Sequence, residues 1–198
     1  MSDRFPDTPL PTRARPTDRW PTALALAGAA AAITVIVLLD RDAELFGPLV
    51  VMMAGIYLMA YALGRRSMAW LGLVVLSAAV SVLLALAQAD VLPVDPAVGM
   101  SVLVLLVWLW TVLRRRFTDG ATFTVQTAGM IGFGAVTLIC AVLAPRWGTL
   151  LAGAGFLAHA AWDAYHFRAN KVVDRPYAEF CGVLDVVIGP VLIITGLV

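Results

Sequence analysis

The sequence predicts an all-α fold, a polytopic membrane helix bundle with seven transmembrane helices. Of the 198 residues, 61% are hydrophobic and only 14% are charged, whereas a soluble domain carries about 45–50% apolar and about 25% charged residues. The apolar residues are gathered into long segments, and a helix of about 20 apolar residues spans a bilayer. The interruptions between these segments carry charged residues, mostly with glycine or proline, as helix ends do.

Seven apolar segments follow one another along the chain, and we expect each to form one helix. In order they are Trp20–Leu39, Leu45–Leu63, Met68–Ala89, Ala97–Leu113, Thr122–Leu143, Trp147–Phe167 and Ala178–Leu197. The interruptions are Asp40–Asp42, Gly64–Arg66, Asp90–Pro96, Arg114–Gly120, Pro145–Arg146 and Arg168–Pro176. Residues 1–19 are polar and rich in arginine and proline, which predicts a disordered cytoplasmic tail. Residues 20–198 then form a single transmembrane domain.

The basic residues predict the orientation, because Lys and Arg gather on the cytoplasmic side of membrane proteins. With the N-terminus in the cytoplasm, only Arg41 and Arg146 lie on the outer side, and the chain ends outside. The cytoplasmic side then holds Arg4, Arg13, Arg15, Arg19, Arg65, Arg66, Arg114, Arg115, Arg116, Arg168, Lys171 and Arg175. Arginine is far commoner than lysine and alanine is abundant, which favours a bacterial origin and the inner (plasma) membrane.

The last two segments contain ionisable side chains, which are costly in a membrane and usually serve a function. His159, Asp163 and His166 follow at i, i+4 and i+7, which places them on one stripe of a helix with His166 nearest the cytoplasm. Asp185 lies roughly 12–14 Å above the start of the last helix near Pro176, at the depth of His159 and Asp163. The short connection predicts that these two helices are antiparallel neighbours.

This group predicts a cytoplasm-facing site between the sixth and seventh helices, with His159, Asp163 and Asp185 as metal ligands. Imidazole and carboxylate groups bind zinc, iron or manganese. His159 and His166 lie about 10.5 Å apart along the helix axis, so one ion does not readily take both. We expect His166 and Asp185 to be catalytic, with His166 as a general base or a substrate contact. Since a metal-bound water is activated for hydrolysis, the leading hypothesis is a metal-dependent membrane hydrolase, hydrolysing or otherwise modifying a lipid-like substrate.

Two other interpretations use the same residues. A structural His/Asp hydrogen-bond network would join the sixth and seventh helices in a membrane scaffold or subunit. A proton- or ion-coupled transporter would use them as a relay, since histidine titrates near neutrality, but no polar path continues to the outer face. The lipid bilayer is the expected partner in each case. Nucleic acid is not expected, and the net charge of +1 points to no other partner.

Further polar side chains occur at similar depth on other predicted helices. Gln126 lies on the fifth helix, and Tyr57 and Tyr61 lie four residues apart on the second. These side chains either support the site or make the ordinary contacts of amides that bridge helices and tyrosines that mark membrane interfaces. Cys140 and Cys181 are interpreted as small buried apolar side chains, and no disulfide is expected.

The run H-A-A-W-D-A-Y-H, followed by F-C and then L-D some twenty residues on, resembles a pattern in small bacterial integral membrane proteins of unknown function. The likeness covers residues 159–185. It implies that the shared signature consists of His159, Trp162, Asp163, His166, Cys181 and Asp185. It implies no activity.

The chain also resembles the membrane-embedded hydrolases of the alkaline ceramidase and progestin/adiponectin receptor group. Those proteins have seven helices and a His/Asp zinc site toward one face, so the resemblance implies a zinc hydrolase. The chain departs from their pattern, because that group uses three histidines on distant helices together with a serine. Here both histidines, His159 and His166, lie in one predicted helix.

Overall fold

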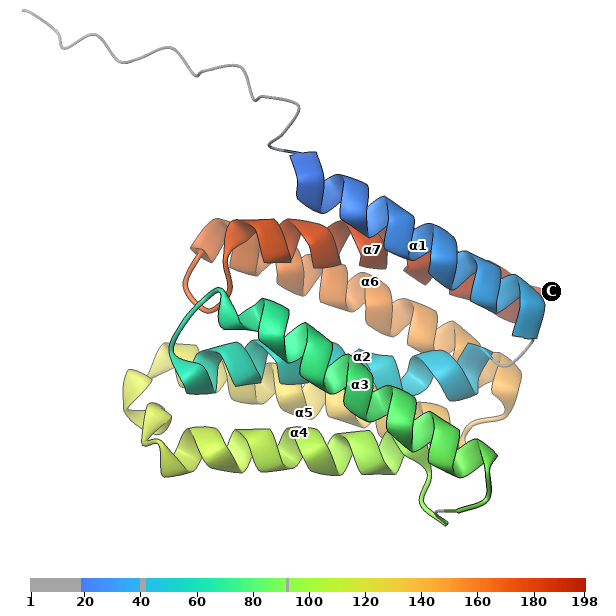
Figure 1. The fold of residues 1–198 in the computed structure, drawn as a ribbon, viewed down its shortest axis with the longest axis horizontal. Coiled ribbons are helices and arrows are strands. Elements are labelled where there is room, and N and C mark those ends of the chain that lie inside the picture. The colour runs from blue at the N-terminus through green and yellow to red at the C-terminus, as the bar shows by residue number, and fades with distance from the viewer. Residues whose placement is uncertain (1–18, 40–41, 92) are drawn as a thin grey trace, which may run out of the picture.

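The computed structural model describes residues 19–39, 42–91 and 93–198. Within them the fold is all-helical, which confirms the all-α part of the prediction, whereas the predicted tail lies outside the described residues except for Arg19. In the described residues, seven α-helices and the 3-10 helix η2 follow in order (Figure 1). They are α1 (Trp20–Leu39), α2 (Asp42–Leu63), α3 (Met68–Gln88), α4 (Pro96–Leu113), η2 (Arg116–Asp119), α5 (Ala121–Val142), α6 (Pro145–Ala169) and α7 (Arg175–Leu197).

The ends of α6 and α7 show why apolar length alone predicted these helices slightly too short. α6 starts at Pro145, since proline fits the first turn of a helix, and it ends where Asn170 adopts a left-handed conformation with φ of 46°. α7 is capped by Asp174, whose carboxylate accepts a hydrogen bond from the backbone N–H of Tyr177. The residues near these ends, such as Arg146, Arg168 and Arg175, are charged, so the ends fall outside a segment defined by hydropathy.

Six of the described helices, α1 to α5 and α7, are long and apolar enough to cross a membrane, consistent with a multi-pass membrane protein. The helix that does not qualify is α6, which carries both histidines of the chain. Its polar content, including Asp163 and Arg168, lowers its hydropathy below that of the other six. The helix that contains most of the predicted site is therefore also the least apolar one.

The helix at the centre of the bundle is α2. In its apolar segment 83% of the residues are buried, against 22% in α1, α3 and α4. It packs against α3, α4, α5 and α6, whereas α1 lies along α7 at one edge (Figure 1). Side chains from the middle of α2 therefore face the interior of the protein, where α6 and α7 also meet.

The packing of α6 on α7 is the most extensive of the bundle and brings two backbones into contact. A Cβ atom on Gly153 of α6 would lie 2.8 Å from the carbonyl oxygen of Gly189 on α7. A Cβ atom on Gly189 would lie 3.0 Å from the carbonyl oxygen of Gly153. Small residues permit this approach in membrane bundles, and it places the polar residues of α6 directly beside those of α7.

Candidate functional site

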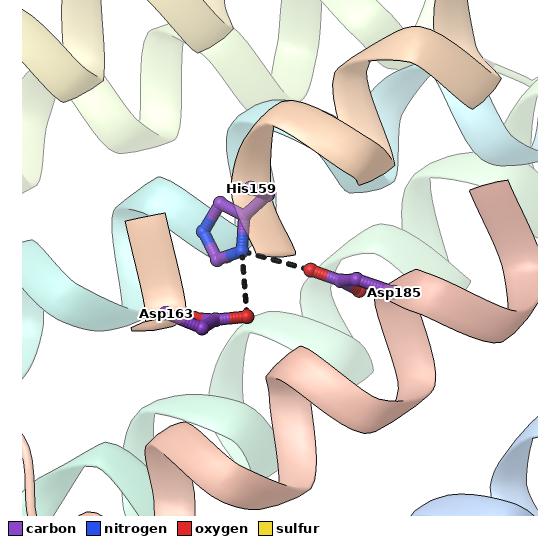
Figure 2. A group of neighbouring side chains, drawn as sticks. All are labelled: His159, Asp163 and Asp185. Carbon is purple, nitrogen blue, oxygen red and sulfur yellow. Dashed lines mark hydrogen bonds and ion pairs between the residues drawn. The ribbon is translucent and has the colours of Figure 1, made fainter. Parts of the chain in front are cut away.

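Three of the predicted site residues form one group: His159 and Asp163 on α6, and Asp185 on α7 (Figure 2). Nδ1 of His159 lies 2.9 Å from Oδ2 of Asp185 and 3.4 Å from Oδ2 of Asp163. The candidate ligand atoms of the three side chains all lie within 4.8 Å of one another. Each of the three residues has 0% of its surface exposed.

Two local features bring these side chains together. On α6, the spacing of four residues puts His159 and Asp163 on the same face of the helix. On α7, Gly182 lies against Asp163, since a Cβ atom there would be 3.3 Å from Cβ of Asp163. The glycine contacts between the helices therefore allow Asp185 to reach the imidazole of His159.

A fourth polar residue reaches the group from the central helix. The hydroxyl of Tyr57 on α2 donates a hydrogen bond to Oδ1 of Asp163, and both groups are buried. Tyr61, the other tyrosine considered from the sequence, lies apart. Its hydroxyl is 2.9 Å from both the carbonyl oxygen of Arg116 and a carboxylate oxygen of Asp119. The two tyrosines share one face of α2, and a single turn along the helix axis gives them different partners.

His166, the predicted general base, lies beside the group and not within it. Its Nδ1 is 3.0 Å from the carbonyl oxygen of Trp162, which can only accept, so Nδ1 carries the proton. Nε2 then accepts a hydrogen bond of 2.8 Å from the side-chain amide of Gln126 on α5. Both ring nitrogens of a neutral imidazole are therefore engaged, and general-base chemistry would require the Gln126 contact to open.

Several atoms of the group are buried without a hydrogen-bond partner. They are Nε2 of His159, Oδ2 of Asp163 and Oδ1 of Asp185. In the part of the chain that the structure describes, neither carboxylate forms an ion pair with lysine or arginine. Buried carboxylates are stable only when charge and hydrogen-bonding capacity are matched. Nδ1 of His159, which faces both aspartates, and the free oxygen lone pairs of the two carboxylates are a donor set that fits a cation.

Gln126 and His166 also line a small pocket. This pocket of about 80 Å³ opens between α5 and the end of α6, and its walls include Gln126, Tyr165 and His166. His159, Asp163 and Asp185 do not line this pocket. The Gln126–His166 pair therefore separates the pocket from the buried group.

The chain matches no protein-family model, no curated protein and no solved structure. The two resemblances drawn from the signature accordingly stay predictions. The fold and the site together define an all-helical protein with six candidate membrane spans and a buried His/Asp group that could hold a metal. Its function has to be argued from the side chains in Figure 2 and their surroundings.

Proposed function

We propose that all seven α-helices cross the inner membrane of a bacterium, with the N-terminus in the cytoplasm and the C-terminus outside. α6 is included because it packs against α2, α5 and α7 within the bundle, which supplies protein contacts for its polar residues. The basic loops after α2 and α6 lie with η2 at one end, where α1 also begins, and the C-terminus lies at the opposite end (Figure 1). The positive-inside rule supports the assignment of the basic end to the cytoplasm.

We propose that His159, Asp163 and Asp185 bind one divalent metal ion. Zinc, iron and manganese all accept a set of imidazole nitrogen and carboxylate oxygen. The two negative charges of the aspartates balance a divalent ion when the imidazole is neutral, which leaves no net charge in the buried group. Tyr57 would act on this site through Asp163, because a hydrogen bond to a ligating carboxylate fixes its orientation.

The activity that this site supports best is metal-assisted hydrolysis or modification of a lipid-like substrate. Three protein ligands leave a coordination position for water, which a bound metal activates as a nucleophile. The surroundings are apolar, with Phe133 and Tyr57 against the imidazole of His159, and the bundle is exposed to lipid on its outer helices. The pocket beside Gln126 and His166 stops at that hydrogen-bonded pair, which would have to part to admit such a substrate from the cytoplasmic leaflet. The convergence of the three ligands within 4.8 Å is the observation on which this proposal depends.

Elemental analysis of the detergent-purified full-length protein tests the metal site. We expect near-stoichiometric zinc, iron or manganese in the wild type and loss of that metal in Asp163→Asn and Asp185→Asn. Glu179→Gln is the matched control, since Glu179 is another acid of α7 and its carboxylate accepts a hydrogen bond from Thr22 outside the group. A folded wild type that carries no metal and takes none up would overturn the proposal.

A structural network is the second candidate, and one observation favours it. The bonds Tyr57–Asp163 and His159–Asp185 join three helices, α2, α6 and α7, at a fully buried point. If the group is only structural, we expect each single substitution in it to lower the stability of the protein. We then expect chelators to have no effect on that stability. The comparison of unfolding with and without a chelator therefore separates the two candidates.

A further inference from the structure

A second polar site lies at the basic end of the bundle, where three connections between helices meet. Here a pocket of about 230 Å³ is enclosed by the end of α2, the α2–α3 loop, η2, the start of α5 and the α6–α7 loop. Its polar walls are formed by Tyr61, Arg65, Arg66, Arg116, Asp119, Thr122 and Lys171. Residues far apart in the sequence thus contribute to one small cavity.

The charge of this pocket is strongly unbalanced. It has four cationic side chains and a single carboxylate, that of Asp119. Asp119 is already engaged, with Nη1 of Arg116 at 3.6 Å and the hydroxyl of Tyr61 at 2.9 Å. Within the described residues, Arg65, Arg66 and Lys171 form no ion pair. Arg66 donates to the carbonyl oxygen of Asn170, which does not neutralise its charge.

An anion in the pocket would relieve the repulsion between these cations. Guanidinium and ammonium groups are the usual protein partners of phosphate, and the hydroxyl of Thr122 adds a neutral donor. Basic pockets between membrane helices on the cytoplasmic side bind the head groups of anionic lipids. The pocket stands at that level of the bundle in the proposed orientation.

We infer that this pocket binds the phosphate of an anionic phospholipid, and that such a phospholipid is the lipid-like substrate of the proposed function. The assignment of this phospholipid as the substrate rests on the proposed function. Both parts of the inference rest on the proposed membrane insertion. The neighbouring 80 Å³ pocket shares Thr122, Lys171 and Val172 with this one and continues to Gln126 and His166. A lipid held by its phosphate therefore stands beside the Gln126–His166 pair, which separates it from the buried group.

The position of the pocket also indicates which part of the lipid would reach the buried group. The end of α6 at Ala169 lies six positions after Asp163, a rise of about 9 Å. The phosphate site lies beyond that helix end, at Lys171. The group of His159, Asp163 and Asp185 therefore lies deeper, on the acyl-chain side of a lipid bound in this way.

Lipid binding to the full-length protein in neutral detergent tests the inference, with native mass spectrometry as the readout. The probes are phosphatidylglycerol, which is anionic, and phosphatidylcholine, whose trimethylammonium group the cations repel. We expect phosphatidylglycerol to bind more tightly. In Arg65→Gln/Lys171→Gln its affinity should fall about 30-fold, since each cation near a lipid phosphate contributes about fivefold. These side chains are exposed, so the variants should fold, and each single variant repeats the test if the double one does not.

The matched control is Arg114→Gln/Arg115→Gln, which removes two exposed charges from the same end of the bundle but not from the pocket. An equal loss of affinity in both double variants would mean that the general surface charge, and not the pocket, attracts the lipid. That result would overturn the inference. Displacement of the lipid by inorganic phosphate at a similar concentration would show a site for free phosphate and also overturn it. Because lipid binding is measured without turnover, its result does not depend on whether the protein binds a metal. A chelator should therefore leave the binding of phosphatidylglycerol to the wild type unchanged.

Discussion

The hydroxyl of Tyr57 on the central helix donates a hydrogen bond to Oδ1 of Asp163 on α6. This contact joins the most buried helix to the least apolar one, at a point where both side chains are inaccessible to water. It also leaves only Oδ2 of Asp163 facing the imidazole of His159. The orientation of one candidate ligand is thus set by a helix that contributes no ligand.

Replacing Tyr57 by phenylalanine should weaken both the fold and the metal site. Loss of the donor leaves a buried carboxylate oxygen unpaired, so we expect a destabilisation of about 1–3 kcal/mol in unfolding experiments. We also expect metal affinity to fall by about 10–100-fold, as when a partner of a ligating group is lost. Tyr61→Phe is the control, because Tyr61 lies outside the group and the hydrogen bonds of its hydroxyl to Arg116 and Asp119 are only partly buried. Equal effects of the two variants would contradict the role assigned to Tyr57.

Asp185→Asn should separate a metal site from a structural network. Asparagine keeps the shape and an acceptor oxygen for His159 but removes the negative charge. With metal at about 100 times its dissociation constant, the wild type gains about 2.7 kcal/mol of stability. We therefore expect a chelator to lower the melting temperature of the wild type and to leave that of Asp185→Asn unchanged. A chelator without effect on the folded wild type would speak against the metal.

The two histidines of α6 provide a paired test of the ligand assignment. His159→Gln should lose the metal, because Nδ1 of His159 is the nitrogen that faces both aspartates. His166→Gln should keep it, since the nitrogens of His166 bond Trp162 and Gln126 instead. Elemental analysis of the two purified variants checks this expectation. A loss of metal in His166→Gln alone would show that the metal site lies at His166, two turns further along α6.

The glycine contact between α6 and α7 can be tested by adding a single methyl group. Gly153→Ala places its Cβ 2.8 Å from the carbonyl oxygen of Gly189, so the helices must separate. We expect a destabilisation of about 1–3 kcal/mol, as in other overpacked sites, together with weaker metal binding. Gly132→Ala on α5 is the control, because nothing lies within 4 Å of the added atom. That variant should be neutral or more stable by about 0.5–1 kcal/mol, the helix preference of alanine over glycine.

Elements and site residues differ in how far the sequence predicts them. Helix positions follow from the length of apolar segments, and the pairing of His159 with Asp163 follows from their spacing along one helix. Asp185 could be matched in depth because α6 and α7 are joined by a short loop. Tyr57 and Gln126 could be named only as candidates for a supporting role. Which of several polar side chains faces the site depends on the neighbours and rotation of α2 and α5, and that information lies in contacts between distant segments.

The low hydropathy of α6 has a consequence for how the protein is made. In the proposed arrangement, the other six helices can each enter lipid alone, whereas α6 brings His159, Asp163 and His166 with it. Its partners for these groups are Tyr57 and Gln126, which precede it in the chain, and Asp185, which follows it. During synthesis, α6 therefore meets α2 and α5 already in the membrane but has to await α7. Stable insertion of the helix that carries most of the candidate site becomes the last step of biogenesis, so a chain cut short before α7 leaves that helix without its final partner.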